Sequence, residues 1–377
     1  MRTPSSLAPI AHRIRKRVGL LPSALEAADE VREVSPLEIV AEPRPFSLPG
    51  QLERVKGVAS ETKLSCELER ASSVRVEHAP TLAMRFARAT LIDGVVYANG
   101  ARVQLVDRRE RLVPRSLRDA PELTQVALPS SVVGDRYFAH FIIEDASAAL
   151  MGRELATPYF AGGTRPRSAH ERRYLELYGL DDIPELRTAR LRDVWVFQDY
   201  AMTAHKRARM ARMRARVRAL PGTRSDHGVF FRRRGAGVDR GLANEVAIEE
   251  RLAREGFEII DVTREDVDGI VRRARDASVV CGVEGSALTH GILCMRQGGA
   301  VVTIQPPYRF NLGQRDYCHA LGMRFGYVVG EGTSTQFEVS EDELMRTLDL
   351  AWARASQGGE HSEPALESAP APHARAA

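Results

Sequence analysis

Apolar and polar residues follow a regular order over the C-terminal half of the chain. Short apolar runs predict strands over 229–231, 258–260, 279–283, 300–304 and 325–329. Between and after them, apolar residues at helical spacing predict helices over 243–254, 263–277, 286–295 and 340–355. Alternation of strands and helices with short connections predicts an α/β fold with a doubly wound parallel sheet. The carboxyl ends of such strands form the edge at which ligands bind.

The N-terminal half carries a weaker pattern of short strands and turns. Apolar runs predict a hairpin over 91–100, with its turn at Asp93 and Gly94, and a buried strand over 194–197. The segment 137–152 has the pattern of a helix. These elements do not define a topology for this half of the chain.

Length and composition predict two domains with loose ends. At 377 residues the chain is longer than one typical core requires. Residues 1–45, with scattered Pro, Ala and charge, predict a flexible arm with one short helix at 21–34. The parts expected to follow are an N-terminal domain, a basic connecting helix, a C-terminal domain and a disordered tail, at 46–205, 206–225, 226–355 and 356–377.

The overall composition is that of a globular protein. Apolar residues make up 44% and charged residues 28%, and no apolar run approaches the roughly 20 residues of a membrane span. We expect no signal peptide, and the four cysteines, which have no metal-binding spacing, suit a reducing cytoplasm. The basic residues comprise 50 Arg and 4 Lys, a bias typical of high-GC bacterial genomes. The net charge of +4 permits acidic partners without requiring nucleic acid.

The strand at 279–283 ends in a turn that is suited to an anion. Gly285 and Ser286 let the backbone approach a ligand, and the helix predicted from Ser286 would point its N–H groups at the same place. Most such turns are ordinary connections between a strand and a helix. We expect a nucleotide diphosphate here, because other polar residues follow a second strand at the same edge.

Those residues come after the strand at 229–231. They are Arg232 and Arg233, then Arg240, then Asn244 and Glu245 at the start of a helix. Guanidinium groups bind a diphosphate bidentately, whereas the amide and carboxylate hold the loop or contact a sugar. The alternative is a solvated basic loop. We favour diphosphate binding because both strands end at one edge of the predicted sheet.

A third group of polar residues lies within the apolar helix predicted at 137–152. His140 and Glu144 are four residues apart, so they share one helical face, and Asp145 follows directly. A carboxylate among apolar residues has a raised pKa and serves as a general base. A buried His–Glu pair of structural value explains the pattern equally well.

The segment 205–218 contains seven Lys and Arg residues and no acid. Met210, Met213, Val217 and Leu220 form one apolar stripe, which predicts a surface helix packed on its own domain. Binding to an anionic membrane or to nucleic acid is the less favoured interpretation.

In this order, the three polar groups resemble glycosyltransferase family 61 over residues 135–330. Its members typically carry a His with a carboxylate four residues later, then a strand ending in an Arg pair with a separated Arg and an Asn-Glu, then the turn Gly-x-His-Gly-Ala-x-Leu-Thr-Asn. Here the turn at 282–290 reads GVEGSALTH. Glu284 therefore stands where the family commonly has His, and His290 where it has Asn. We expect Glu284 to contact ribose or donor-sugar hydroxyls.

The resemblance implies two Rossmann-like domains in a GT-B-like arrangement and an inverting transfer of sugar from a nucleotide-sugar to an acceptor hydroxyl. The expected catalytic residues are His140, Glu144 and Asp145, and the choice of base among them stays open. The expected donor-binding residues are Arg232, Arg233, Arg240, Asn244, Glu245, Glu284, Gly285, Ser286, Ala287 and His290. Because these groups supply positive charge, no metal cofactor is expected.

Further expectations concern partners and place. A UDP-sugar is the favoured donor, and the acceptor is a glycan or a lipid-linked glycan in bacterial capsular or exopolysaccharide synthesis. The location is expected to be cytoplasmic, with peripheral contact at the inner face of the membrane as an option, and no nucleic acid is expected. The main alternative is a non-catalytic GT-B-like subunit that binds nucleotide-sugar or glycan.

Overall fold

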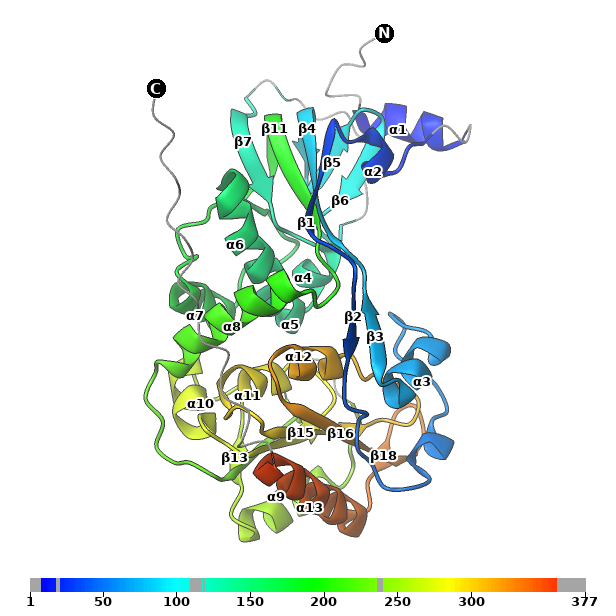
Figure 1. Cartoon of the computed structure of the whole chain (residues 1–377), viewed down its shortest axis with the longest axis vertical. Helices are drawn as coiled ribbons and strands as arrows, with labels where there is room; N and C mark the ends of the chain where they lie inside the picture. The colour runs from blue at the N-terminus through cyan, green and yellow to red at the C-terminus, as the bar shows by residue number, and fades with distance from the viewer. Residues whose placement is uncertain (1–7, 18–20, 109–116, 118, 236–239, 358–377) are drawn as a thin grey trace.

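The computed structural model describes residues 8–17, 21–108, 117, 119–235 and 240–357. Two sheets lie at opposite ends of the molecule, and a layer of helices separates them (Figure 1).

The C-terminal sheet has five strands in the order β13-β12-β14-β15-β16. They are β12 (Gly228–Phe231), β13 (Glu258–Ile260), β14 (Val279–Val283), β15 (Ala300–Gln305) and β16 (Arg324–Val329), and all neighbours pair in parallel. The chain runs from β12 outward to β13 and then back to β14 on the other side of β12. The switch point of the sheet therefore lies between β12 and β14. The predicted parallel sheet is confirmed.

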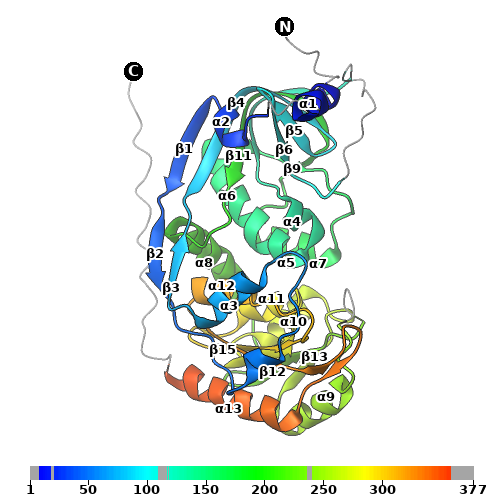
Figure 2. The same ribbon diagram turned by 90° about the vertical axis from the view of Figure 1, so that its right-hand side faces the viewer.

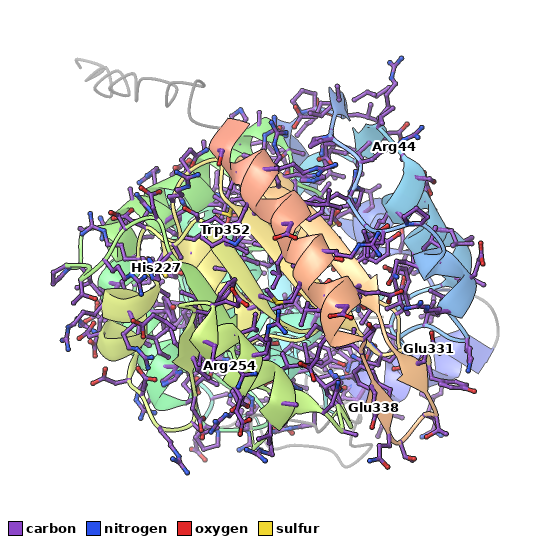
Figure 3. The ribbon with its side chains drawn as sticks, turned by 90° about the horizontal axis from the view of Figure 1, so that it is seen from below. Arg44, His227, Arg254, Glu331, Glu338 and Trp352 are labelled. Carbon is purple, nitrogen blue, oxygen red and sulfur yellow. The ribbon has the colours of Figure 1, made fainter. Side chains whose placement is uncertain are left out.

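Helices cover both faces of this sheet because its strands are apolar on both sides. One face carries α10 (Val267–Ala274), α11 (Leu288–Cys294) and α12 (Gln314–Ala320), which are drawn above the sheet in Figure 1. The other carries α9 (Glu245–Arg254) and α13 (Glu341–Gln357), and Figure 3 shows α13 lying across that face with Trp352. A small hairpin of β17 (Glu331–Gly332) and β18 (Phe337–Glu338) adjoins them.

The N-terminal sheet is mixed, so the prediction of two Rossmann-like domains is wrong for this half. Its strands are β1 (Glu30–Ser35), β4 (Thr81–Ile92), β5 (Val95–Ala98), β6 (Ala101–Gln104), β7 (Glu122–Leu128), β8 (Thr157–Pro158) and β11 (Thr188–Gln198). Only β7 pairs in parallel, with β11 and β8, and the other pairs are antiparallel. The hairpin turn at Asp93 and Gly94, both with positive φ, forces β4 and β5 to run antiparallel.

The helical layer contains α4 (Val132–Arg136), α5 (Phe138–His140), α6 (Ala146–Leu155), α7 (Ala169–Tyr178) and α8 (Ala204–Arg218). The short strands β9 (Phe160–Ala161) and β10 (Glu185–Leu186) pair beside it. The helix predicted at 137–152 is present, but the π-helical turn η3 (Phe141–Asp145) interrupts it. One apolar core includes buried residues of this layer and of the C-terminal sheet. None of the helices in the described ranges is long and apolar enough to span a bilayer.

The basic helix α8 packs on the protein itself, as its apolar stripe predicts. Met210, Met213 and Val217 are buried in the shared core. Most of its cations bind groups of the same chain: Lys206 donates to the carbonyl oxygen of Asp199, and Arg209 pairs with the Asp199 carboxylate at 2.6 Å. Similar bonds extend from Arg207, Arg214, Arg216 and Arg218. Most of the α8 cations are thus hydrogen-bonded within the fold, and Arg207, Arg209 and Arg218 form ion pairs.

The segment predicted as a flexible arm contributes regular structure instead. It contains α1 (Ala8–Arg17), α2 (Ala24–Ala27), β1 and β2 (Glu38–Ala41), so the helix predicted at 21–34 is restricted to α2. β2 pairs with β3 (Arg75–His78), and Figure 2 shows β1, β2 and β3 along one side of the molecule. The parts of the predicted arm and tail at 1–7, 18–20 and 358–377 lie outside the described residues.

The segment that follows β2 belongs to the C-terminal sheet rather than to the N-terminal domain. It contains η2 (Gln51–Arg54) and α3 (Leu64–Ser72). The Phe46 N–H donates to the Phe325 carbonyl oxygen at 3.0 Å, and the Tyr327 N–H donates to the Phe46 carbonyl oxygen at 3.0 Å. This backbone therefore extends the edge of β16, whereas the sequence predicts that residues from 46 onward belong to an N-terminal domain.

Substitution of Gly326 tests this docking. A Cβ at Gly326 would lie 2.3 Å from the Phe46 ring, so Gly326→Ala is expected to lower the free energy of unfolding by about 1–3 kcal/mol. Urea denaturation measures the change. The double variant Phe46→Leu with Gly326→Ala should recover part of the loss, and purely additive losses would contradict the contact.

Candidate active site

A cleft of about 930 Å³ lies between the helical layer and the C-terminal sheet. The segments that follow β12 and β14 both line it, so it sits at the switch point of the sheet. Nine predicted site residues line this cleft: His140, Glu144, Arg233, Arg240, Glu284, Gly285, Ser286, Ala287 and His290. The other four, Asp145, Arg232, Asn244 and Glu245, lie outside its lining.

The turn after β14 forms one wall of the cleft. Gly285 has a φ of 152°, which residues with a Cβ rarely adopt. A Cβ there would lie 2.6 Å from Nη1 of Arg233, so the glycine also lets this guanidinium lie against the turn. Gln314 of α12 donates its side-chain amide to the Gly285 carbonyl oxygen at 2.5 Å. The Arg233 guanidinium therefore lies beside the turn at Gly285, which the Gln314 hydrogen bond holds in place.

Two further arginines flank Glu284 in this wall. Oε2 of Glu284 lies 3.4 Å from Nε of Arg240 and 3.6 Å from Nε of Arg309. Burial raises the pKa of Glu284, and the arginine charges offset only part of that effect. Arg309 also lies 3.4 Å from Glu61. Three guanidinium groups, those of Arg233, Arg240 and Arg309, thus line the cleft near two carboxylates, and guanidinium groups are charge-assisted donors to anions.

Across the cleft, His140 and Glu144 form a hydrogen-bonded dyad at the π-helical turn. Nδ1 of His140 lies 3.0 Å from Oε1 of Glu144, so Nδ1 carries the proton of the neutral ring. The hydroxyl of Tyr317, from α12, donates to the same Oε1 at 2.7 Å and lies 3.1 Å from Nδ1. The C-terminal domain therefore completes the dyad of the helical layer.

Charge fixes the ionisation of the dyad. Burial favours a raised pKa for Glu144, but Lys206, His140 and the Tyr317 hydroxyl outweigh it and hold the pKa at about 2. Burial favours a lowered pKa for His140, yet the negative charge of Glu144 more than compensates and the pKa is raised. An ionised carboxylate that orients an imidazole and raises its basicity is a general-base arrangement.

The family model of Glycosyltransferase 61 matches residues 117–302. This range contains the dyad and the turn after β14. The match supports glycosyltransferase family 61. None of the curated proteins compared with the chain matches it significantly. Arg309 and Tyr317 lie beyond the range that matches the glycosyltransferase model, although both line the same cleft.

Arg232 lies outside the cleft lining, contrary to its predicted contact with a diphosphate. Its guanidinium pairs with both carboxylate oxygens of Glu249 and lies 3.4 Å from Asp261. Consecutive residues at a strand end point to opposite sides, so Arg233 faces the cleft and Arg232 faces α9.

The two arginines form a matched pair for mutagenesis. Arg232→Ala is expected to destabilise the fold by about 1–3 kcal/mol, because it leaves the buried Glu249 unpaired, without changing nucleotide affinity. Arg233→Ala is expected to weaken nucleotide binding. Thermal unfolding and calorimetric titration of both variants separate the two effects, and weakened binding in Arg232→Ala alone would contradict the assignment.

Asn244 and Glu245 hold the backbone around the cleft rather than line it. Glu245 accepts hydrogen bonds from the N–H groups of Arg233 and Arg234 at 2.5 and 3.0 Å. The Asn244 side chain donates to the Val339 carbonyl oxygen at 2.8 Å and accepts from its N–H at 3.3 Å. Of the two roles expected from the sequence, the structure favours holding the loop over sugar contact.

Asp145 lies beneath the dyad, away from the cleft lining. It accepts hydrogen bonds from the Ser131 hydroxyl at 2.7 Å and the Ser131 N–H at 3.2 Å, which fixes the start of α4. Burial raises the pKa of Asp145 to about 7 in spite of these bonds. With no access to the cleft, this carboxyl is poorly placed to contact a substrate.

His290 is buried and neutral, because burial lowers its pKa to about 3. Its ring stacks on Phe138 with 4.9 Å between centroids, and Nδ1 lies 2.8 Å from the Tyr174 hydroxyl. It therefore lines the cleft as an aromatic surface rather than as a charge.

Sequence reasoning did not identify Arg309, Gln314 or Tyr317 as site residues. Arg309 lies in an irregular segment, and α12 is a seven-residue helix without a clear apolar stripe. The pattern offered no signal for them beyond their position after a strand of the parallel sheet. Within the described ranges, no group of three or more His, Cys, Asp and Glu side chains is arranged to hold a metal ion.

Proposed function

We propose that this protein is an inverting glycosyltransferase that moves a sugar from a nucleotide-sugar, preferably a UDP-sugar, to an acceptor hydroxyl without a divalent metal. The observation that carries the proposal is the position of the His140–Glu144 dyad across one cleft from Arg233, Arg240 and the Gly285 turn. A base and an anion site facing one another are the two parts that such a transfer requires.

The donor diphosphate would lie against the turn after β14. Arg233, Arg240 and Arg309 would bind its oxygens with charge-assisted hydrogen bonds. Negative charge grows on the diphosphate as the bond to the sugar breaks. Fixed guanidinium groups therefore stabilise the transition state more than they stabilise the bound donor in its ground state. They would thereby supply the charge that a divalent ion supplies in metal-dependent transferases.

The acceptor would enter on the side of the dyad. Its hydroxyl oxygen attacks the anomeric carbon opposite the diphosphate, and the bond between that carbon and the diphosphate oxygen breaks. Nε2 of His140 takes the hydroxyl proton, while Glu144 holds the Nδ1 proton and stabilises the imidazolium that forms. Because the displacement is single, the anomeric configuration inverts.

This mechanism predicts the acid limb of the pH profile. Only neutral His140 accepts a proton, so kcat/KM should rise with pH through the raised pKa of His140, above its ordinary value of 6.5. Glu144→Gln removes the charge that raises this pKa, and the limb should move to lower pH. Arg232→Ala should leave it unchanged, and an acid limb that stays fixed in Glu144→Gln would contradict His140 as the base.

The wider setting is part of the proposal. A donor-binding parallel sheet facing an acceptor-side domain corresponds to a GT-B-like division of labour, even with a mixed N-terminal sheet. We place the reaction in bacterial capsular or exopolysaccharide synthesis in the cytoplasm, with a glycan or lipid-linked acceptor and no nucleic acid. Any peripheral membrane contact would need charges other than those that α8 already uses internally.

The test is turnover of a panel of nucleotide-sugars by the full chain in EDTA, with NMR reading the anomeric configuration of the product. The proposal expects release of one nucleoside diphosphate and an inverted product. A retained configuration would exclude the single displacement. Tight nucleotide binding without any turnover would favour the non-catalytic binding subunit, which the departures at Glu284 and His290 make the second candidate.

A further inference from the structure

The two ends of the cleft differ in chemistry. The lining near Val262 contains the rings of Phe138, His170 and His290 together with Ala169, and Arg165, Ser168 and Glu171 flank them in sequence. We call this the aromatic end. The lining near Gln314 contains Glu61, Arg70, Asn311 and Asp316, with Tyr137 hydrogen-bonded to Glu61 and Tyr317 hydrogen-bonded to Glu144, and we call it the polar end.

Flat rings form the aromatic end. The Phe138 ring stacks on His290, and the His170 ring meets His290 edge-on with 5.1 Å between centroids. Nε2 of His170 lies 3.0 Å from the Glu265 carbonyl oxygen, which fixes its orientation. With Val262 alongside, these rings form an apolar surface that suits a planar aromatic ligand group.

The polar end offers hydrogen-bond acceptors. Oε1 of Gln314 is buried and has no hydrogen-bond partner among the described residues, because the amide group of this side chain is used on Gly285. A buried acceptor that lines a cleft requires a donor, and sugar hydroxyls are such donors. Tyr317, three residues later on α12, contacts the His140–Glu144 dyad, so the dyad belongs to this end.

The sheet order keeps the two ends apart. Val262 follows β13 and Asn311 follows β15, whereas Arg233 and the Gly285 turn follow β12 and β14 between them. At about 4.8 Å per strand, β13 and β15 are about 14 Å apart. Figure 1 accordingly shows α7 and α10 on one side of the parallel sheet and α12 and α3 toward the other.

We infer that the nucleotide-sugar lies along the cleft in one direction, with its nucleobase in the aromatic end beside Val262 and its sugar in the polar end beside Gln314 and the dyad. This inference rests on the proposed function. The diphosphate then bridges the ends at Arg233, Arg240 and Arg309. The opposite direction would put an aromatic base over the carboxylates of the polar end and the anomeric carbon far from His140.

Blocking each end separately tests the direction. Val262→Phe fills the aromatic end and Asn311→Phe fills the polar end, and both residues are only partly buried. Calorimetry would measure the Kd of pyrophosphate, of the nucleoside diphosphate that binds the wild type most tightly among UDP, GDP, CDP and ADP, and of the matching nucleotide-sugar. Val262→Ala is the control without added bulk.

In Val262→Phe we expect the Kd of the nucleoside diphosphate to rise at least about tenfold, while the Kd of pyrophosphate stays the same. In Asn311→Phe we expect the Kd values of pyrophosphate and of the nucleoside diphosphate to stay the same, while the Kd of the nucleotide-sugar rises at least about tenfold. Unchanged pyrophosphate binding also shows that each variant is folded.

The reverse pattern, with nucleoside diphosphate binding lost in Asn311→Phe and kept in Val262→Phe, would overturn the assigned direction. Equal effects of the two substitutions on the nucleoside diphosphate would overturn it too. Failure of the wild type to bind either pyrophosphate or any nucleoside diphosphate is a different result, since it would contradict the proposed function itself.

Discussion

Replacing His140 by Ala is expected to lower the rate of sugar transfer by about 10²–10⁴-fold while leaving the affinity for nucleoside diphosphate nearly unchanged. Nδ1 of His140 is bonded to Glu144, so Nε2 is the nitrogen that can take a proton from the acceptor. The diphosphate contacts lie on the opposite wall of the cleft. Steady-state kinetics and calorimetry on the same preparation measure the two quantities.

Tyr317→Phe is the matched control, since it removes only the hydroxyl that donates to Glu144. Loss of one hydrogen bond to a charged group is worth about 1.5–3 kcal/mol, so we expect the rate of sugar transfer to fall by about 10–100-fold. Retention of more than a tenth of the wild-type rate in His140→Ala would contradict the assignment of the base.

The double variant Arg240→Ala with Arg309→Ala is expected to raise the Kd of nucleoside diphosphate at least about 100-fold. Each guanidinium supplies a charge-assisted contact to the diphosphate. Both guanidinium groups lie within 3.6 Å of Glu284 in one wall of the cleft, so the double variant removes two neighbouring cations at once. Calorimetric titration measures the affinity, and thermal unfolding checks that the variant is folded.

Glu284→Gln tests the same site by the opposite change, because it removes a carboxylate rather than two cations. It removes a negative charge beside the anion site and releases both arginines, so pyrophosphate should bind severalfold more tightly. Unchanged affinity for nucleoside diphosphate in the double arginine variant would show that the diphosphate binds elsewhere. Weaker pyrophosphate binding in Glu284→Gln would show that Glu284 is needed to position the two arginines.

The C-terminal half of the fold can be predicted from the sequence, because there the local pattern of strands and helices also determines how the strands pair. Every strand of the C-terminal sheet is a short apolar run, and the strand–helix alternation leaves a parallel arrangement as the natural solution. The N-terminal sheet depends on the pairing of β4 with β11, about a hundred residues apart, which no local pattern encodes. The hairpin at Asp93 and Gly94 and the strand predicted over 194–197, which lies within β11, are the parts of it with a local signal.

The site was predictable where a motif sits on a regular element. His140 with Glu144, and Gly285 with Ser286, follow from helical spacing and from a strand end. To decide which of Arg232 and Arg233 faces the cleft, one must know the direction in which each side chain points, and the sequence does not give it. Tyr317 and Arg309 reach the cleft from α12 and a loop, through packing between distant segments, so only the structure reveals them.

The most direct test of the central claim is the thermal shift of the full chain with UDP, GDP, CMP and ADP, each with and without EDTA. A ligand that binds the folded state raises the melting temperature by mass action. We predict a shift with one nucleotide that survives EDTA, persists in Arg232→Ala and disappears in the variant lacking Arg240 and Arg309. No shift with any of the four nucleotides would contradict a nucleotide-sugar site in this cleft.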